Sequence, residues 1–161
     1  MELQHLLLPE FQYEVTLTEK FIKRIPVDKM VWRPHPKSMS ILQLANHLSE
    51  IPQLVIAIMD KEELNFADYK APDNKNIDEI VQFLRTGASM AESSLRKPDE
   101  EYQEIWKLKK GDQTMIEMPR LNVLRNLALN QLPHHRAQLG VYFRLLDIPV
   151  PATYGPSADE V

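Results

Sequence analysis

The residues best suited to chemistry lie in the stretch 129–139, where Gln131 and His135 are four residues apart. On a helix this spacing places both side chains on one face, and that face continues through Leu124 and Leu139. An otherwise apolar face packs against a core, and a polar group aimed into a core is costly unless it bonds to a partner. We therefore expect Gln131 and His135 to meet a metal ion, an ordered water or another buried polar side chain.

A second histidine, His47, belongs to another amphipathic segment and has Leu44 and Ile51 as its neighbours at helical spacing. These neighbours are apolar, so His47 is also expected to face inward. Two inward histidines and an inward amide, contributed by two helices, form a candidate site with three ligands: His47, Gln131 and His135. Two facing histidines that share a water are the alternative, and the spacing alone does not separate the two.

Residues beside these three are candidates for supporting roles. Glu50, one turn after His47, is a weak candidate for a hydrogen-bond acceptor behind that histidine or for a proton carrier, because a carboxylate on a helix more often lies at the surface. Asn46 and Gln138 are candidates for orienting ligands or water, as the neighbours of metal ligands commonly do. Arg136 is expected to face outward and to pair with an acid.

The composition is that of a globular protein, with 161 residues, 43% apolar and 26% charged. The length predicts one domain, residues 1–161. A net charge of −4 without a basic run argues against nucleic-acid binding, and no apolar run approaches the roughly 20 residues that span a bilayer. The first residues lack the features of a signal peptide, which predicts a cytoplasmic protein. There is no cysteine, so any thiol chemistry requires a thiol from a cosubstrate.

Apolar residues recur with helical spacing in four segments, at about 3–25, 41–61, 77–96 and 119–147. Ser40 and Gln43 form a capping box before the second segment, and Asn76 is a candidate cap for the third. Residues 62–75 are expected to form a loop whose Phe66 and Tyr69 pack back onto the body. The sequence therefore predicts an all-α, antiparallel four-helix bundle, in which the long connections before the second and fourth helices allow crossovers.

A different pattern precedes the last helix. Residues 105–109 alternate between apolar and polar types, Lys110-Gly111-Asp112 forms a turn signal, and alternation resumes from Thr114 to Met118. This pattern predicts a possible short hairpin. Pro119 is expected in the first turn of the last helix.

Two blocks of the sequence resemble the DinB/YfiT-like superfamily of bacterial four-helix-bundle proteins, named for small DNA-damage-inducible proteins and unrelated to the polymerase with the same label. They are residues 130–156 and the segment from Trp32-Arg33-Pro34 to Leu44-Ala45-Asn46-His47-Leu48. The family pattern is a metal site of three histidines, one on the second helix and a His-x-x-x-His pair on the last. His47 and His135 match the first and third, and Gln131 stands where the pattern has the middle histidine. His134 does not replace it, because it lies about 100° around the helix from His135.

This resemblance implies a divalent metal ion, zinc or nickel, at one end of the bundle, and a homodimer. Some members join a low-molecular-weight thiol to an electrophile, so the resemblance implies a thiol (S-)transferase, or a hydrolase that activates water, in stress response or detoxification. The alternative is a non-catalytic, dimeric binding or stress-response module with a degenerate metal site, because an amide is a weaker ligand than imidazole. Trp106, an aromatic residue of the hairpin that a single bundle would struggle to cover, also favours a dimer.

Overall fold

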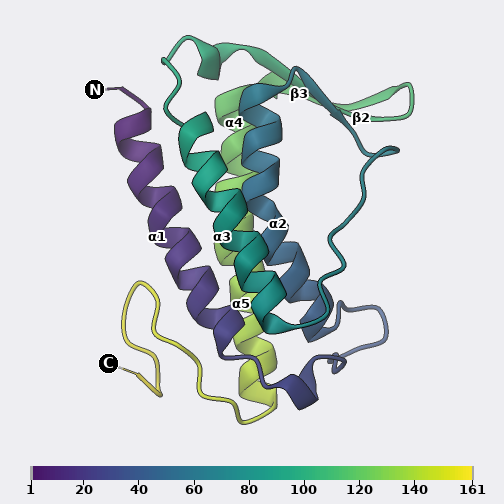
Figure 1. Ribbon diagram of the computed structural model, residues 1–161, viewed down its shortest axis with the longest axis vertical. Helices are drawn as coiled ribbons and strands as arrows, with labels where there is room; N and C mark the ends of the chain where they lie inside the picture. Colours follow the sequence, from purple (N-terminus) through teal and green to yellow (C-terminus); the bar gives the residue numbers. More distant parts are fainter. Residues whose placement is uncertain (1, 161) are drawn as a thin grey trace.

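Four helical segments run side by side in the computed structural model, which describes residues 2–160 (Figure 1). A π-helical turn, Arg125–Leu129, joins two of the helices into one long segment. The helices are α1 (Gln4–Lys23), α2 (Ile41–Asp60), α3 (Ile77–Ser94), α4 (Arg120–Leu124) and α5 (Gln131–Leu145). Short 3-10 turns at Val27–Lys29 and Glu101–Gln103 lie in the connections.

Helices α2 and α3 run parallel, and α1 and the α4–α5 segment run in the opposite direction (Figure 1). The parallel pair is evident from its two ends: Lys97 Nζ donates to Met59 O at the C-terminal end, and Asn46 bonds to Asn74 at the N-terminal end. The connection from α2 to α3 must therefore run back along α2, from the C-terminal end of α2 to the N-terminal end of α3. The sequence allowed crossovers before the second and fourth helices, but the structure has its crossover before α3, in residues 61–76.

A three-stranded sheet covers one end of the bundle (Figure 1). Strands β2 (Ile105–Lys110) and β3 (Gln113–Pro119) form the expected hairpin, which is confirmed. A further strand, β1 (Glu63–Asn65), pairs in parallel with β2, and Leu64 lies opposite Leu108. The expected all-α class is therefore wrong: the chain is mostly helical with a small sheet. A three-residue strand is too short to show a period of two, and its partner lies far along the chain.

The helix starts follow from local side-chain hydrogen bonds. Ser40 Oγ accepts from Gln43 N at 3.2 Å, and Gln43 Oε1 accepts from Ser40 N at 2.9 Å, so the capping box is confirmed. Asn76 Oδ1 accepts from Glu79 N at 2.9 Å at the start of α3. Pro119 ends β3 and directly precedes the first residue of α4, one position earlier than expected.

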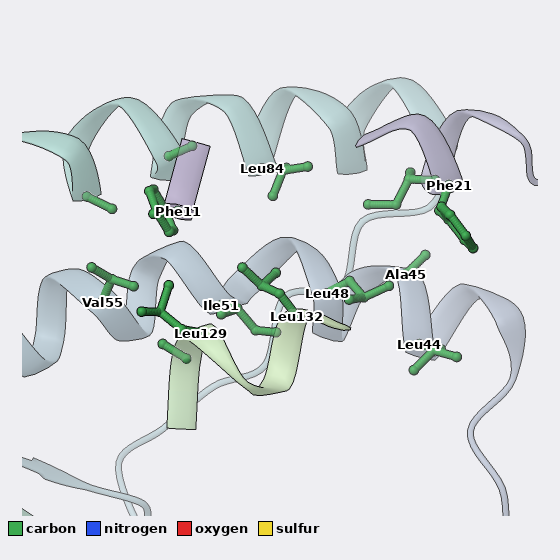
Figure 2. Close-up of a cluster of buried hydrophobic side chains, with 14 of the residues drawn as sticks. Phe11, Phe21, Leu44, Ala45, Leu48, Ile51, Val55, Leu84, Leu129 and Leu132 are labelled. Carbon is green, nitrogen blue, oxygen red and sulfur yellow. The ribbon is translucent and has the colours of Figure 1, made fainter. Parts of the chain in front are cut away.

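The core lies between the four segments, and Figure 2 shows part of it. Each segment contributes side chains with no exposed surface: Phe11, Leu48, Leu84 and Leu132 come from α1, α2, α3 and α5. Burying one such side chain stabilises the fold by about 1.5–3 kcal/mol before the entropy of ordering is subtracted. In residues 2–160 we find no helix that combines the length and the hydropathy needed to cross a bilayer.

The hairpin tryptophan is part of this core rather than a patch on the surface. Trp106 is fully buried, and its Nε1 donates to Ala57 O in the last turns of α2 at 3.1 Å. The expectation that Trp106 would need a second chain to cover it was therefore wrong. The homodimer remains a prediction that rests on the family resemblance alone.

Candidate functional site

The structure brings His47 and His135 together between α2 and α5. Their Nε2 atoms are 3.0 Å apart, and the ring planes meet at 77° with centroids 4.4 Å apart. His135 is buried and His47 is half-buried, so the pair lies at the edge of the core. The two histidines that the sequence assigned to inward faces thus point at each other with the same ring atom.

The outer ring nitrogens determine where the protons are. His47 Nδ1 lies 2.5 Å from Glu50 Oε1, and His135 Nδ1 lies 3.0 Å from Gln138 Oε1. A carboxylate oxygen and an amide oxygen both accept hydrogen bonds, so each Nδ1 carries a proton. In two neutral rings the facing Nε2 atoms would then both present lone pairs. Such an arrangement is repulsive unless a proton or a metal ion lies between the two nitrogens.

A hydrogen bond with His134 fixes the position of the Gln138 side chain. Its Nε2 donates to His134 Nε2 at 3.1 Å, which fixes the amide oxygen toward His135. Gln138 was expected to orient a ligand, and the structure places it directly behind His135. His134 is exposed, and the geometry gives it contact with Gln138 rather than with His47.

Burial lowers the pKa of His135 below its ordinary value. The hydrogen bond with Gln138 acts in the opposite direction, and the neighbouring His47 and His134 add to the lowering. Desolvation disfavours the charged imidazolium, so His135 is neutral at neutral pH. A neutral imidazole with a proton on Nδ1 offers the Nε2 lone pair, which is the form that binds metals.

The separation of the two nitrogens provides a test of whether a metal ion fits. With metal–nitrogen distances of about 2.1 Å, two ligands at 90° are about 3.0 Å apart and two at the tetrahedral angle about 3.4 Å apart. The observed 3.0 Å matches the smaller angle. The pair therefore fits two adjacent positions of a six-coordinate ion better than two corners of a tetrahedral one.

The third expected ligand, Gln131, lines the same cavity as His47 and Glu50. Its Nε2 donates to Asn126 O, a carbonyl of the π turn, at 3.2 Å. This bond uses the amide nitrogen and not the oxygen that would bind a metal ion. Within residues 2–160 no group of three His, Cys, Asp or Glu side chains is arranged to hold a metal ion. A metal ion here would thus have two imidazoles, with the remaining positions left to the Gln131 oxygen and to water.

Glu50 is held on both sides of its carboxylate. Oε1 bonds to His47, and Oε2 accepts a short hydrogen bond from the Tyr69 hydroxyl. Only 13% of the Glu50 side chain is exposed, so it is not the ordinary surface carboxylate that its position suggested. Carboxylates that bond to the outer nitrogen of a metal-binding histidine fix its orientation and raise its basicity.

Tyr69 belongs to the crossover segment 62–75, which we call the strap. Figure 1 shows the strap descending beside α2 from the sheet to the start of α3. Asn46 fastens its lower end: its Nδ2 donates to Asn74 O at 3.0 Å, and its Oδ1 accepts from Asn74 N at 3.1 Å. Asn46 was expected to orient a ligand or water, but in the structure its side chain bonds to Asn74 of the strap. The sequence offered no signal for the contact between Tyr69 and Glu50.

Arg136, next to His135, corrects another expectation. Its side chain is 2% exposed and therefore does not face outward, although it does pair with an acid, Glu14 of α1. The two side chains are 2.7 Å apart between Nη1 and Oε2, and Tyr154 of the C-terminal segment bonds to both. This ion pair is separate from the histidine pair and joins α1, α5 and the C-terminal segment.

The fold and the site together define the class: a mostly helical bundle protein with a pair of histidines at the edge of its core. The DinB family model matches residues 1–161, and the chain belongs to the DinB family. No curated protein matches the chain.

Solved structures share the fold. A DinB-like protein from Bacillus subtilis is 17% identical with a TM-score of 0.66, over 95% of this chain and 96% of that one. A DinB-like protein from Bacillus cereus is 21% identical with a TM-score of 0.67, over 95% and 98%. A candidate member of the DinB family from Exiguobacterium sibiricum is 19% identical with a TM-score of 0.71, over 92% and 95%. At these identities the likeness concerns the fold.

Proposed function

We propose that this DinB-family protein binds a divalent metal ion, zinc or nickel, between His47 and His135, with the Gln131 side-chain oxygen as a third, weaker ligand. One observation carries the proposal: two Nε2 atoms face each other at 3.0 Å while both Nδ1 atoms are bonded to acceptors. A cation between them removes the repulsion of the two lone pairs.

The activity that such a site supports is thiol transfer to an electrophile, or hydrolysis. The bound ion would supply a Lewis acid that lowers the pKa of a thiol or a water. The chain has no cysteine, so the thiol must arrive as a low-molecular-weight cosubstrate. We place the activity in detoxification or stress response and in a homodimer, as the family resemblance implies, and we propose a cytoplasmic location.

The residues of the chain have defined tasks in this scheme. Glu50 Oε1 and Gln138 Oε1 hold the protons on the Nδ1 atoms of His47 and His135, so that both Nε2 atoms face the ion. Tyr69 holds the other oxygen of Glu50 and keeps that carboxylate turned toward His47. Gln131, which lines the same cavity as His47, would have to release its bond to Asn126 O to bind the ion through its amide oxygen.

The experiment is a calorimetric titration of zinc and nickel into untagged, metal-free protein, with the metal content measured after purification. His135→Ala should abolish binding, and His134→Ala, which removes the support of Gln138 and a ring beside His135 but no metal ligand, should change Kd by less than about threefold. Gln131→His should tighten binding tenfold or more, about 1.4 kcal/mol, because imidazole is a stronger ligand than an amide. Unchanged affinity in Gln131→His, or loss of binding in His134→Ala, would show that the ligands are assigned to the wrong residues.

A second candidate function follows from the same amide. The Gln131 amide is already satisfied by its hydrogen bond to Asn126 O and needs no metal ion as a partner. This observation supports a site that has lost its metal ion. The protein would then be a non-catalytic, dimeric binding or stress-response module. Wild-type protein that binds neither ion, together with a Gln131→His variant that does, would favour this alternative.

A further inference from the structure

A long cavity of about 650 Å³ lies beside the histidine pair, a size typical of small-molecule sites. One wall is the face of α2 from His47 to Lys61, positions that a helix separates by about 21 Å. Leu127 of the π turn and Leu108 of β2 belong to the opposite side. Leu64, Phe66 and Tyr69 of the strap also line the cavity, and Figure 1 shows the strap running beside α2 on the outside of the bundle.

The lining is mainly apolar between its two polar ends. Ile51 and Leu54 of α2, Leu127 of the π turn and other aliphatic residues line it. Glu50, at one end, is already bonded to His47 and Tyr69, and Lys61, at the other, is exposed. The other polar side chains of the lining, Gln53, Gln131 and Tyr69, are uncharged, so a charged group placed between these ends would lose its hydration without meeting an opposite charge. The cavity therefore suits a molecule whose body is uncharged.

We propose that this cavity holds the body of the substrate, an uncharged, elongated and mainly apolar organic molecule with its reactive end at His47. The inference rests on the proposed function for the identity of the reacting end, while the binding itself needs no metal ion.

The strap is the element that encloses the molecule. It is fixed at one end by the pairing of β1 with β2 and at the other by the hydrogen bonds of Asn74 to Asn46. Between these points Tyr69 bonds to Glu50, and the Tyr69 ring packs against Phe66 with centroids 5.7 Å apart. In this scheme a ligand enters beneath the strap and opens the Tyr69–Glu50 bond, which also supports His47.

The test uses full-length, metal-free protein in a chelator and the uncharged apolar dye N-phenyl-1-naphthylamine. Trp106 bonds to Ala57, a residue of the cavity lining, so energy transfer from tryptophan reports bound dye, and substitutions in the lining locate it. We expect saturable one-to-one binding. Leu54→Gln and Leu127→Gln should each raise Kd at least tenfold, because they place an amide in the apolar lining.

The matched control is Leu42→Gln, since Leu42 is also a half-buried leucine of α2 but lies outside the cavity lining. This variant should bind the dye within twofold of the wild-type protein. Absence of saturable binding, or equal weakening by Leu42→Gln, would overturn the site. Tighter binding of the anionic dye 8-anilinonaphthalene-1-sulfonate than of the uncharged dye would overturn the ligand class.

Two further variants test the role of the strap and separate dye binding from metal binding. Tyr69→Phe keeps the ring but removes the bond to Glu50, so it should speed dye dissociation at least threefold in stopped-flow measurements; an unchanged rate would overturn enclosure by the strap. His135 does not line the cavity, so His135→Ala should bind the dye within threefold of wild type. If the wild-type protein binds the dye but no metal ion, the proposed function is refuted and the cavity assignment stands. If it binds the metal ion but not the dye, the cavity assignment is refuted and the proposed function stands.

Discussion

Replacing Glu14 with glutamine should destabilise the protein more than most single substitutions. Glu14 and Arg136 are 8% and 2% exposed, and Glu14 Oε2 lies 2.7 Å from Arg136 Nη1. Arg136 also donates to Glu14 O and to Thr18 Oγ1, both at 3.3 Å, so the guanidinium is held inside the bundle. The Glu14→Gln variant would leave this charge buried without its counter-charge.

The magnitude follows from the burial of both groups. Removing one partner of a buried pair costs about 3–5 kcal/mol, whereas replacing both by apolar residues of similar volume is about neutral or stabilising. For a chain of this length each kcal/mol corresponds to about 2–4 °C in Tm. We therefore expect Glu14→Gln to lower Tm by about 6–20 °C. The double variant Glu14→Leu/Arg136→Met should unfold close to wild type.

Urea denaturation of the wild type, Glu14→Leu, Arg136→Met and the double variant measures the coupling directly. Tyr154→Phe is the comparison for the rest of the network. It removes a hydroxyl that donates to Glu14 Oε1 and accepts from Arg136 Nη2, both at 2.6 Å. Because Tyr154 is 63% exposed, water can take over these bonds, and the cost should be less than half that of Glu14→Gln. A cost below about 1 kcal/mol for Glu14→Gln, or a double variant as unstable as the singles, would refute the reasoning.

Three other predictions concern local contacts. Ser40→Ala should cost about 0.5–2 kcal/mol in urea denaturation, because α2 loses its cap, and no loss would contradict the role of the capping box. Burial, with a smaller contribution from Asp99, raises the pKa of Tyr102 to about 12, so stability should fall as pH rises from 10 toward 12. Tyr102→Phe should remove this fall, and an absorbance titration in which every tyrosine ionises near pH 10 would contradict it. The bond to Arg85 lowers the pKa of Glu19 to about 2, so its contribution is present above pH 4.5 and lost as pH falls toward 2; Arg85→Met should flatten thermal stability in that window.

Much of the fold follows from local pattern. The helix boundaries agree with the structure to within a few residues because caps, prolines and apolar spacing act over one or two turns. The same spacing indicated the inward faces of His47 and His135, and the structure brings their rings together. The strand β1 could not be predicted, because three residues carry no period and the pairing is with a strand about 40 residues later. The contact of Tyr69 with Glu50 is hidden for the same reason, since the path of the strap depends on the parallel packing of α2 and α3.

The burial of Arg136 was missed for a different reason. The sequence does contain a sign of it, but that sign is an acidic residue on another helix. Helix α5 packs against both α1 and α2, so its buried sector is wider than one apolar stripe, and a residue 100° from His135 is buried as well. Glu14 lies on the apolar stripe of α1 between Phe11 and Thr18, where a lone acid calls for a buried cation.

Polar residues that interrupt apolar stripes therefore meet in pairs in this bundle, and the charges of the two pairs differ. Glu14 and Arg136 bring opposite charges together, so their pair is complete within the chain. His47 and His135 bring together two bases, and the carboxylate of Glu50 stands behind one of them. Burial disfavours a proton on His135, so this histidine does not readily supply the positive charge that the arrangement requires. The metal ion of our proposal would supply this charge between the histidines, whereas the more deeply buried ion pair between α1 and α5 needs no such ligand.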